Sequence, residues 1–348
     1  MKAVYFEAHG GLDVLRYGDV PDPSPAAGEV VIRVEAAGLN HNDIWARQGL
    51  PKIAVPLPHI SGSDAAGVVT EVGPGVVYPR VGDEVVVYPI QSCRVCQHCL
   101  AGEELFCRTM EVWGFQTGPL IGAFSQYARV QAAQCLPKPA HLSWSEAAVT
   151  SSAMLTVWRM LVTRTQTKPG EHVLIFGASG GTGTAAIQLT KAIGAVSIAV
   201  ASSQRKAEFC ESLGADHVIR SDLHDVAREA RRITHRKGVD VVFDHVGATT
   251  WQIGIEALRW GGRLVICGAT EGFEAKTDLR FLWNKQLSLL GSHAGTHREW
   301  VQAMRLVEER ALRPALTEVI GLQDLPDAQA RMAARGTIGK IAVDMVGR

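Results

Sequence analysis

The sequence predicts a two-domain α/β protein, with a mostly β first half and a second half built on a doubly wound parallel sheet. The chain has 348 residues, whereas a usual domain has roughly 100–200. Up to about residue 130, short β-branched runs are separated by Gly and Pro, which is typical of strands joined by tight turns. From about residue 145, apolar runs alternate with helix-like segments, and this alternation indicates a parallel sheet covered on both faces.

The charge and hydropathy of the chain exclude several classes of partner. The sequence has 35 basic and 35 acidic side chains, so no global field attracts nucleic acid or an anionic membrane. The N-terminus lacks the apolar core of a signal peptide, and no apolar run approaches the roughly 18 residues of a membrane span. We therefore expect a soluble, cytoplasmic protein that acts on a small molecule, with no nucleic-acid or membrane partner.

Short strands are expected first in the chain, at residues 3–6, 30–36, 67–72 and 83–88. A helix is expected to begin near Asp43. Asn40 and Asn42 precede it, and asparagine is a preferred residue at the position that caps a helix. A capping role is therefore one interpretation of both asparagines.

Four cysteines are clustered in the segment 90–110, with gaps of two, two and seven residues between them: Cys93, Cys96, Cys99 and Cys107. Four thiolates suit a tetrahedral zinc ion with no open position, so the site should be structural. Such clustering favours a metal site in a reducing compartment over a disulfide framework. Four free cysteines are the alternative, and His98, within the cluster, is not needed as a ligand.

The strands of the second half are expected at residues 173–176, 196–201, 217–219, 239–243, 263–267 and 287–290. A helix is expected at residues 300–312, and a last strand at 340–345 should return to the first domain. The predicted boundaries place residues 1–140 and 297–348 in the first domain and residues 141–296 in the second.

A glycine-rich turn follows the first strand of the second half, and a helical pattern starts at Thr184. Glycine lets the backbone turn sharply and approach a pyrophosphate, which the N-terminus of the next helix attracts. The turn therefore predicts a dinucleotide site, and a simple tight connection is the alternative. Its candidate cofactor-binding residues are Gly177, Ser179, Gly180, Gly181, Thr182 and Gly183.

The next strand ends in small hydroxyl residues and two cations, at Ser202, Ser203, Arg205 and Lys206. A site that prefers NAD places an acidic residue there, on the ribose 2′-hydroxyl. No acid is present in this stretch, and cations suit a 2′-phosphate. We expect the cofactor to be NADP(H); alternatively, the cations begin an exposed helix face.

Several motifs resemble the medium-chain dehydrogenase/reductase superfamily, which contains zinc alcohol dehydrogenases and quinone or enoyl reductases. They are AAGLNHNDIW, HISGSDAAGVV, VGDEVV, the cysteine segment, GASGGTG and the terminal GKIAV. The resemblance covers essentially the whole chain and implies a GroES-like β domain, a Rossmann domain with an active site in the cleft between the two, and a homo-oligomer, dimer or tetramer. It also implies that His245 and Gly268, which follow two later strands, approach the cofactor.

The resemblance also bears on a catalytic metal. Zinc alcohol dehydrogenases of this superfamily bind one through a cysteine, a histidine and often a second cysteine, and the matching positions here are Asn40, Ser63 and Ser152. None is a good zinc ligand, so no catalytic zinc is expected and Asp64 should be a structural or hydrogen-bonding residue. A site rescued by His41 and His59 is the alternative.

A narrower resemblance is to crotonyl-CoA carboxylase/reductases, through VWGFQTG, AFSQYARVQAAQCLPKP, LRFLWNKQ and LLGSHAG. It implies catalytic roles for Asn40, for Phe115 with Gln116, and for His293. Gln116 is an amide where the carboxylating relatives carry glutamate, so plain reduction is expected in place of carboxylation. A core position for Phe115 and a backbone hydrogen bond for His293 are the structural alternatives.

The expected function is that of an NADPH-dependent oxidoreductase. It would transfer a hydride to an activated C=C bond, in an enoyl-CoA, an enone or a quinone, without a catalytic zinc. An alcohol dehydrogenase with unusual zinc ligands is one alternative, and a protein that binds the nucleotide without turnover is another.

Overall fold

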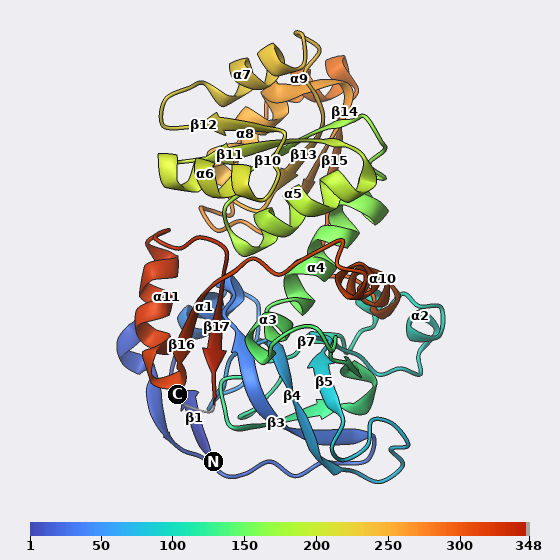
Figure 1. The fold of residues 1–348 in the computed structure, drawn as a ribbon, viewed down its shortest axis with the longest axis vertical. Coiled ribbons are helices and arrows are strands. Elements are labelled where there is room, and N and C mark those ends of the chain that lie inside the picture. Colours follow the sequence, from blue (N-terminus) through green and yellow to red (C-terminus); the bar gives the residue numbers. More distant parts are fainter. Residues whose placement is uncertain (346–348) are drawn as a thin grey trace. The chain divides into compact units, whose positions relative to one another are not determined.

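The computed structural model describes residues 1–345 and divides the chain into two compact units (Figure 1). The first unit contains Met1–Ser152, Thr296–Met304 and the chain from Leu316 onward. The second contains Ala153–Gly295 and Arg305–Ala315. Residues 346–348, which belong to the predicted first domain, lie outside the described residues.

A seven-stranded sheet forms the centre of the first unit. Its strands are β3 (Glu29–Gly38), β4 (Asp64–Val72), β5 (Glu84–Val87), β8 (Tyr127–Gln131), β9 (Cys135–Pro137), β16 (Leu316–Gly321) and β17 (Lys340–Asp344). Inside it, Val30, Ile32 and Val34 of β3 are fully or almost fully buried and share a core with Trp113 and Phe124. Burial of these β-branched side chains supplies the main driving force for this sheet.

The last strand joins this sheet, as predicted. Strand β17 pairs antiparallel with β3, with Ala342 opposite Gly38, and parallel with β16. Residues 340–344 are therefore next to the C-terminal end of β3, some 300 residues earlier in the chain. This pairing positions Lys340 beside the segment that follows β3.

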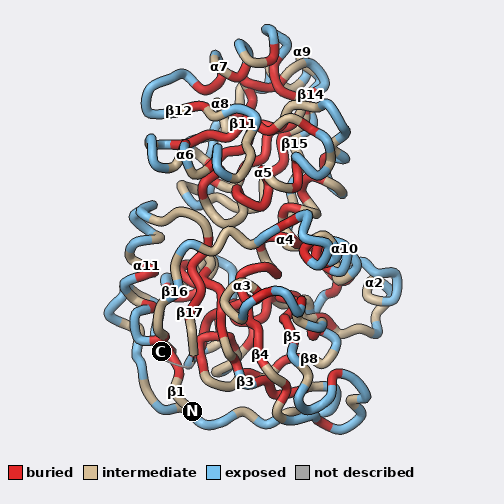
Figure 2. Tube along the Cα trace, in the orientation of Figure 1, coloured by how far each residue is buried: buried red, intermediate tan, exposed pale blue. Residues whose placement is uncertain are grey.

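The second unit has a six-stranded parallel sheet in the order β12-β11-β10-β13-β14-β15. The strands are β10 (His172–Ile175), β11 (Val196–Ala201), β12 (His217–Arg220), β13 (Val239–Asp244), β14 (Leu258–Ile266) and β15 (Ser288–Gly291). Figure 1 shows α5 and α6 on one face and α7, α8 and α9 on the other, and Figure 2 shows buried residues along the strands of both units. The predicted fold class is confirmed, and the strand order reverses between β10 and β13.

The remaining elements are shorter or peripheral. The other strands are β1 (Lys2–Tyr5), β2 (Arg16–Asp19), β6 (Ile90–Gln91) and β7 (Glu111–Val112). The helices are α1 (His41–Gln48), α2 (Gln97–Leu100), α3 (Trp144–Ala148), α4 (Ser151–Trp158) with a π-helical continuation (Arg159–Arg164), α5 (Gly181–Ile193), α6 (Gln204–Ser212), α7 (Val226–Ile233), α8 (Ala248–Ala257), α9 (Leu279–Lys285), α10 (His297–Glu308) and α11 (Leu325–Ala333). Short 3-10 turns lie at Leu12–Val14, Glu104–Phe106, Ala132–Gln134 and Leu322–Asp324. Within residues 1–345, no helix combines the length and apolarity needed to span a membrane.

The predicted starts of α10 and β14 were wrong by several residues. Helix α10 begins at His297 instead of residue 300, because Glu299 accepts a hydrogen bond from the Thr296 backbone N–H and Thr296 Oγ accepts one from the Glu299 backbone N–H. This reciprocal capping box starts the helix early. Strand β14 begins at Leu258, five residues before the predicted residue 263, because Leu258 already pairs with Val239.

Candidate functional site

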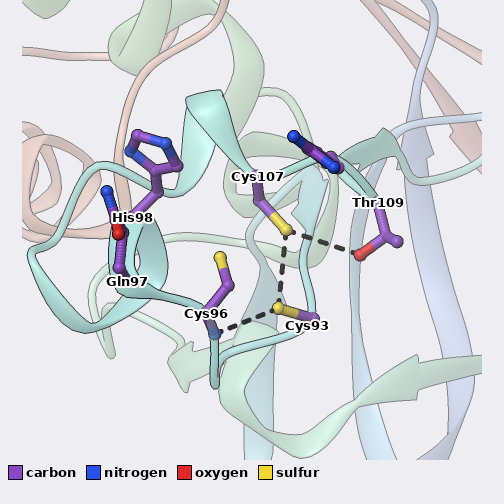
Figure 3. Close-up of a pocket in the computed structure, with 7 residues that line it drawn as sticks. Cys93, Cys96, Gln97, His98, Cys107 and Thr109 are labelled. Atoms are coloured by element: carbon purple, nitrogen blue, oxygen red, sulfur yellow. Dashed lines mark hydrogen bonds between the residues drawn. The ribbon is translucent and has the colours of Figure 1, made fainter.

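The four cysteines converge in a small lobe of the first unit, and Figure 3 shows three of them, Cys93, Cys96 and Cys107. All four sulfur atoms lie within 4.8 Å of one another. Cys93 Sγ is 3.8 Å from Cys99 Sγ and 3.5 Å from Cys107 Sγ. Four sulfurs held about 2.3 Å from a tetrahedral zinc ion would be roughly 3.8 Å apart, so this donor set has the spacing that a zinc ion needs.

The thiols of the lobe have local partners that favour the thiolate form. A hydrogen bond with Thr109 lowers the pKa of Cys107 to about 6. Backbone N–H groups, including that of Cys96 at 3.4 Å, lower the pKa of Cys93. Burial raises the pKa of Cys99 to about 11. A metal ion binds thiolates, so two of these sulfurs are prepared for ligation by the protein itself.

Neighbouring residues of the lobe serve other purposes. His98 pairs with Glu103 at 3.6 Å, and Figure 3 shows its ring turned away from the sulfur atoms. Glu104 is buried, and it accepts hydrogen bonds from Tyr88 Oη and from the backbone N–H of His297. Glu104 therefore ties the lobe to the sheet and to the first residue of α10.

A buried polar network occupies the region that follows β3. Asn40 Nδ2 donates to Asp64 Oδ2 at 2.8 Å, and Lys340 Nζ donates to Asn40 Oδ1 at 2.5 Å. The backbone N–H and the hydroxyl of Ser152 both donate to Asp64 Oδ1, at 2.8 and 2.7 Å. The network thus joins four segments that are far apart in the sequence.

Ser63 has its own partner beside this network. Asn42 Nδ2 donates to Ser63 Oγ at 2.6 Å, while Asn42 Oδ1 is buried without a hydrogen-bond partner. An unpaired buried carbonyl oxygen carries a free-energy cost unless a ligand or water satisfies it. The Asn42 Oδ1 atom is therefore an acceptor that a ligand or a water molecule could satisfy, whereas the motifs indicated a catalytic role for Asn40.

Helix α1 begins at His41, directly after Asn40 and two residues before the expected Asp43, and Asp43 secures its first turn. Asp43 is fully buried, and its two carboxyl oxygens accept the backbone N–H groups of Asn40 at 2.7 Å and Gly62 at 3.0 Å. Burial raises the pKa of Asp43 to about 7. This side chain holds together the two segments, 40–43 and 62–64, that carry the polar network.

Substitution Asp43→Asn should destabilise the protein by about 1–3 kcal/mol at pH 5, because an amide can accept only one of the two N–H bonds. The unfolded chain releases the Asp43 proton near pH 4 and the folded chain near pH 7. The protonated Asp43 side chain therefore makes its full contribution to the free energy of unfolding below about pH 4, and this contribution is lost as the pH rises toward and through 7. The difference in the free energy of unfolding between wild type and variant, measured by thermal unfolding, should become smaller from pH 5 to pH 8. Asp327→Asn, at an exposed position, is the control; a difference independent of pH would contradict this account.

The segment 112–118 packs directly on residues 59–64. Gly114 has φ +68°, and a Cβ there would lie 1.9 Å from the carbonyl oxygen of Gly62. His59 is buried, its Nε2 faces the carbonyl oxygen of Gly114 at 3.3 Å, and burial lowers its pKa to about 4. A neutral His59 thus helps to hold the two segments in contact, and only glycine fits at position 114.

Phe115 and Gln116 come directly after Gly114 in the chain. Because Gly114 packs against Gly62, both residues lie close to the segment that contains Ser63 and Asp64. Phe115 is buried. Gln116 Oε1 accepts the backbone N–H of Val112 at 3.0 Å, which uses its carbonyl in a local turn. A core role for Phe115 is consistent with this burial, while its catalytic role and that of Gln116 remain predictions.

The glycine-rich turn lies at the switch point of the parallel sheet. Gly177 follows β10 with φ +62°, and a Cβ there would lie 2.5 Å from the imidazole of His245, which follows β13. A Cβ on Gly183 would lie 2.3 Å from the carbonyl oxygen of Gly177. Helix α5 begins at Gly181, three residues before the predicted Thr184, because the Gly180 carbonyl accepts the Thr184 N–H. Open-sheet proteins bind nucleotides at this position.

His245 lines the same position with an unsatisfied group. Its Nδ1 atom is buried without a hydrogen-bond partner, and burial lowers its pKa to about 4. The ring is therefore neutral at physiological pH and keeps one nitrogen for a ligand. Ser179 is buried, and Thr182 and Gly268 are partly exposed.

The end of β11 brings hydroxyls and a cation together. Lys206 Nζ donates to Ser202 Oγ at 3.3 Å, and Ser203 caps α6 by accepting the Lys206 N–H. Arg205 is exposed. In the turn after the adjacent strand β12, Asp222 is neutralised by Arg220, the last residue of that strand, at 2.5 Å. This corner therefore presents hydroxyl groups and positive charge at the end of β11.

His293 lies two residues beyond β15 and is exposed within the second unit. The structure does not place it relative to Asn40, which belongs to the other unit. Its catalytic role remains a prediction. Asp64 forms hydrogen bonds, as expected, but Lys340 was not predicted as a site residue. One sequence signal was available. Lys340 and Asp64 each begin an apolar strand, and charged residues are rarely buried without a partner.

Two family profiles match the chain. One, described as the GroES-like domain of alcohol dehydrogenases, matches residues 26–140, and one described as a zinc-binding dehydrogenase matches residues 181–309. Together with the parallel sheet, its glycine turn and the cysteine lobe, these matches define the class. The chain belongs to the medium-chain dehydrogenase/reductase superfamily, a group of oxidoreductases.

Within this superfamily, the chain is similar to a crotonyl-CoA carboxylase/reductase from Cereibacter sphaeroides, with 37% identity over 95% of this chain and 83% of the relative. The structure of the crotonyl-CoA carboxylase/reductase AntE in complex with NADP matches with a TM-score of 0.91 and 32% identity, covering 100% of this chain and 95% of that one. A structure described as an NAD-dependent alcohol dehydrogenase matches with a TM-score of 0.94 and 38% identity, covering 99% and 100%. Both resemblances inferred from the motifs are thus confirmed.

Proposed function

We propose that the protein is an NADPH-dependent reductase of activated C=C bonds, with a short enoyl-CoA thioester as the first substrate to test and enones or quinones as the wider class. The observation that carries this proposal is the chemistry of the polar network. The resemblance matches the catalytic-zinc positions of alcohol dehydrogenases to Asn40, Ser63 and Ser152, and the side chains of these three residues hydrogen-bond to protein partners. Such a site has no ligand set for zinc.

The cofactor assignment is supported by two features of the second unit. The glycines at the switch point leave room for a pyrophosphate at the N-terminus of α5. Ser202, Arg205 and Lys206 offer hydroxyl and positive charge for a 2′-phosphate. His245 would contact the ribose or the nicotinamide from β13. When bound, NADPH supplies the hydride for reduction of the double bond.

A structural zinc in the cysteine lobe is part of the proposal. Among residues 1–345, Cys93, Cys96, Cys99 and Cys107 are the single group of His, Cys or acidic side chains with the geometry for a metal ion. Four sulfur ligands would leave no open position for substrate. This zinc would hold the lobe and take no part in the reduction.

The chain's own contribution to the reaction is to bind and polarise the substrate carbonyl. Reduction of an unsaturated thioester builds negative charge on that oxygen, and fixed N–H donors stabilise it. Asn40 is our candidate donor in the first unit, with Phe115 as a packing surface for the acyl chain. Gln116 carries no negative charge, which favours protonation over carbon dioxide capture. His293 is the candidate proton donor or orienting group.

The test is NADPH oxidation by the purified protein with crotonyl-CoA, with and without bicarbonate, followed by mass analysis of the product. We expect butyryl-CoA under both conditions. A carboxylated product with bicarbonate would show that Gln116 replaces the glutamate of the carboxylating relatives, and the Gln116→Glu variant gives the matched comparison. Absence of turnover with crotonyl-CoA, simple enones and quinones would overturn the proposal.

An alcohol dehydrogenase is the second candidate, because a structure so described matches 99% of this chain with a TM-score of 0.94. This function would require a second metal ion at a site other than the one built from Asn40, Ser63 and Ser152. Two zinc ions per chain, with rapid loss of alcohol oxidation on mild chelation, would support it. One zinc ion per chain favours the reductase.

A further inference from the structure

Lys340 is a buried cation with three oxygen neighbours. Its side chain is 6% exposed. The ammonium donates to the Leu39 carbonyl oxygen at 3.0 Å and to Asn40 Oδ1 at 2.5 Å, and it lies 3.5 Å from Asp64 Oδ2. Two of the three N–H donors of the ammonium therefore make hydrogen bonds, and the group also forms an ion pair with the Asp64 carboxylate. The geometry at Lys340 is therefore well defined.

Asp64 is the matching buried anion. Its side chain is fully buried, and it accepts hydrogen bonds from Asn40 Nδ2 and from both the N–H and the hydroxyl of Ser152. Ser152 lies in the first turn of α4 (Ser151–Trp158), where the helix dipole favours a negative charge. The carboxylate thus accepts three hydrogen bonds, and its charge is balanced by Lys340.

A buried ion pair is weak evidence for stability, because desolvation offsets much of its Coulomb attraction. Apolar residues of similar volume would pack in the same place at no such cost. The pair does, however, define the orientation of the amide between its two charges. The Asn40 carbonyl faces the ammonium and its NH₂ group faces the carboxylate; a flipped amide would meet like partners on both sides.

The fixed amide retains one hydrogen with a weak partner. One hydrogen of Asn40 Nδ2 is taken by Asp64 at 2.8 Å, whereas the other contact, to the Gly38 carbonyl oxygen, is 3.4 Å long. Donation by Lys340 to the amide oxygen polarises the group and strengthens its NH₂ as a donor. The second hydrogen is therefore the one that a ligand oxygen can capture.

We propose that Lys340 and Asp64 are positioning residues that hold the Asn40 amide as a polarised hydrogen-bond donor to the carbonyl oxygen of an α,β-unsaturated substrate. The ion pair would thus supply the polarisation that a metal supplies in metal-dependent relatives. This inference rests on the proposed function, because it takes the substrate to be a carbonyl compound. It adds two charged residues, and a reason for their burial, that the function itself does not require.

The test compares Lys340→Met, Asp64→Asn and the double variant with wild type. Loss of a fixed donor should lower kcat for crotonyl-CoA about 100-fold in all three, with KM for NADPH within about twofold of wild type. The double variant should recover most of the melting temperature lost by the single variants, since neither charge is left unpaired. Lys168→Met, at an exposed lysine, should match wild type. Recovery of kcat in the double variant together with stability would overturn the proposal, because it would show that the pair is only structural.

A spectroscopic measurement separates this inference from the proposed function. The carbonyl stretch of bound butyryl-CoA, labelled with ¹³C at the thioester, should shift to lower frequency in wild type relative to the free thioester. That shift should be lost in the double variant, which still binds the product. Binding with the same shift in both proteins would overturn the positioning role alone. Failure of wild type to bind butyryl-CoA or to reduce crotonyl-CoA would overturn the proposed function, and with it the thioester form of this inference.

Discussion

Substitution Cys96→Ala is expected to reduce the zinc content of the purified protein from one ion per chain to nearly none and to lower the melting temperature by about 5–10 °C. The lobe contains little apolar packing of its own, since Val95, Leu100 and Phe106 are 75%, 76% and 63% exposed. A bound ion would therefore supply much of the free energy that keeps this segment folded. Metal analysis by mass spectrometry and thermal unfolding measure the two effects.

The matched control for this prediction is Cys210→Ala, which removes a buried thiol from α6, outside the cluster. It should leave the zinc content unchanged. In wild type, a chelator should abolish NADPH oxidation slowly, at the rate at which the lobe unfolds. Retention of a full zinc content in Cys96→Ala, or immediate loss of turnover on chelation, would contradict a purely structural metal.

Substitution Ser202→Asp is expected to lower kcat/KM for NADPH by about 100-fold or more and to shift the preference toward NADH. The new carboxylate would repel a 2′-phosphate, and it would pair with Lys206, whose Nζ lies 3.3 Å from Ser202 Oγ. With NADH, the same carboxylate would accept a hydrogen bond from the ribose hydroxyl. Initial rates with both cofactors measure the change in preference.

Ser212→Asp places the same charge on the last residue of α6, at an exposed position, and should leave the cofactor preference unchanged. Arg205→Ala should weaken NADPH binding without improving the use of NADH. If Ser202→Asp kept its preference for NADPH, the ribose would have to lie elsewhere than at the end of β11, and the cofactor assignment would lose its main support.

Parts of the candidate site whose residues are close together in the chain could be predicted from the sequence, and parts whose residues are far apart could not. Cys93, Cys96, Cys99 and Cys107 lie within one lobe, so their spacing alone indicated a metal site. The glycine-rich turn is equally local, although the structure was needed to show that close packing requires glycine at Gly177 and Gly183. Short-range features of this kind leave their signal in adjacent residues.

The role of Asn40 was different. The sequence allowed two interpretations of Asn40, as a helix cap or as a functional residue. The neighbouring residues in the chain did not decide between the two. The structure shows that its side chain is bonded to Asp64 and Lys340, the second of which is 300 residues away. A contact over this distance depends on the pairing of β17 with β3, and no local pattern reports it.

By itself the sequence determined the alternation of strands and helices, the fold class, the cysteine cluster and the glycine turn, because periodicity and short spacings are properties of neighbouring residues. Only the tertiary structure decided which charges are buried together. It brought Asp64 and Lys340 to the Asn40 amide and Ser152 to Asp64, and it set His245 against Gly177 where the strand order reverses. The physical reason is that burial and charge pairing act between segments that the sheets bring together. Their energies therefore depend on strand order and register, which no short stretch of the sequence specifies.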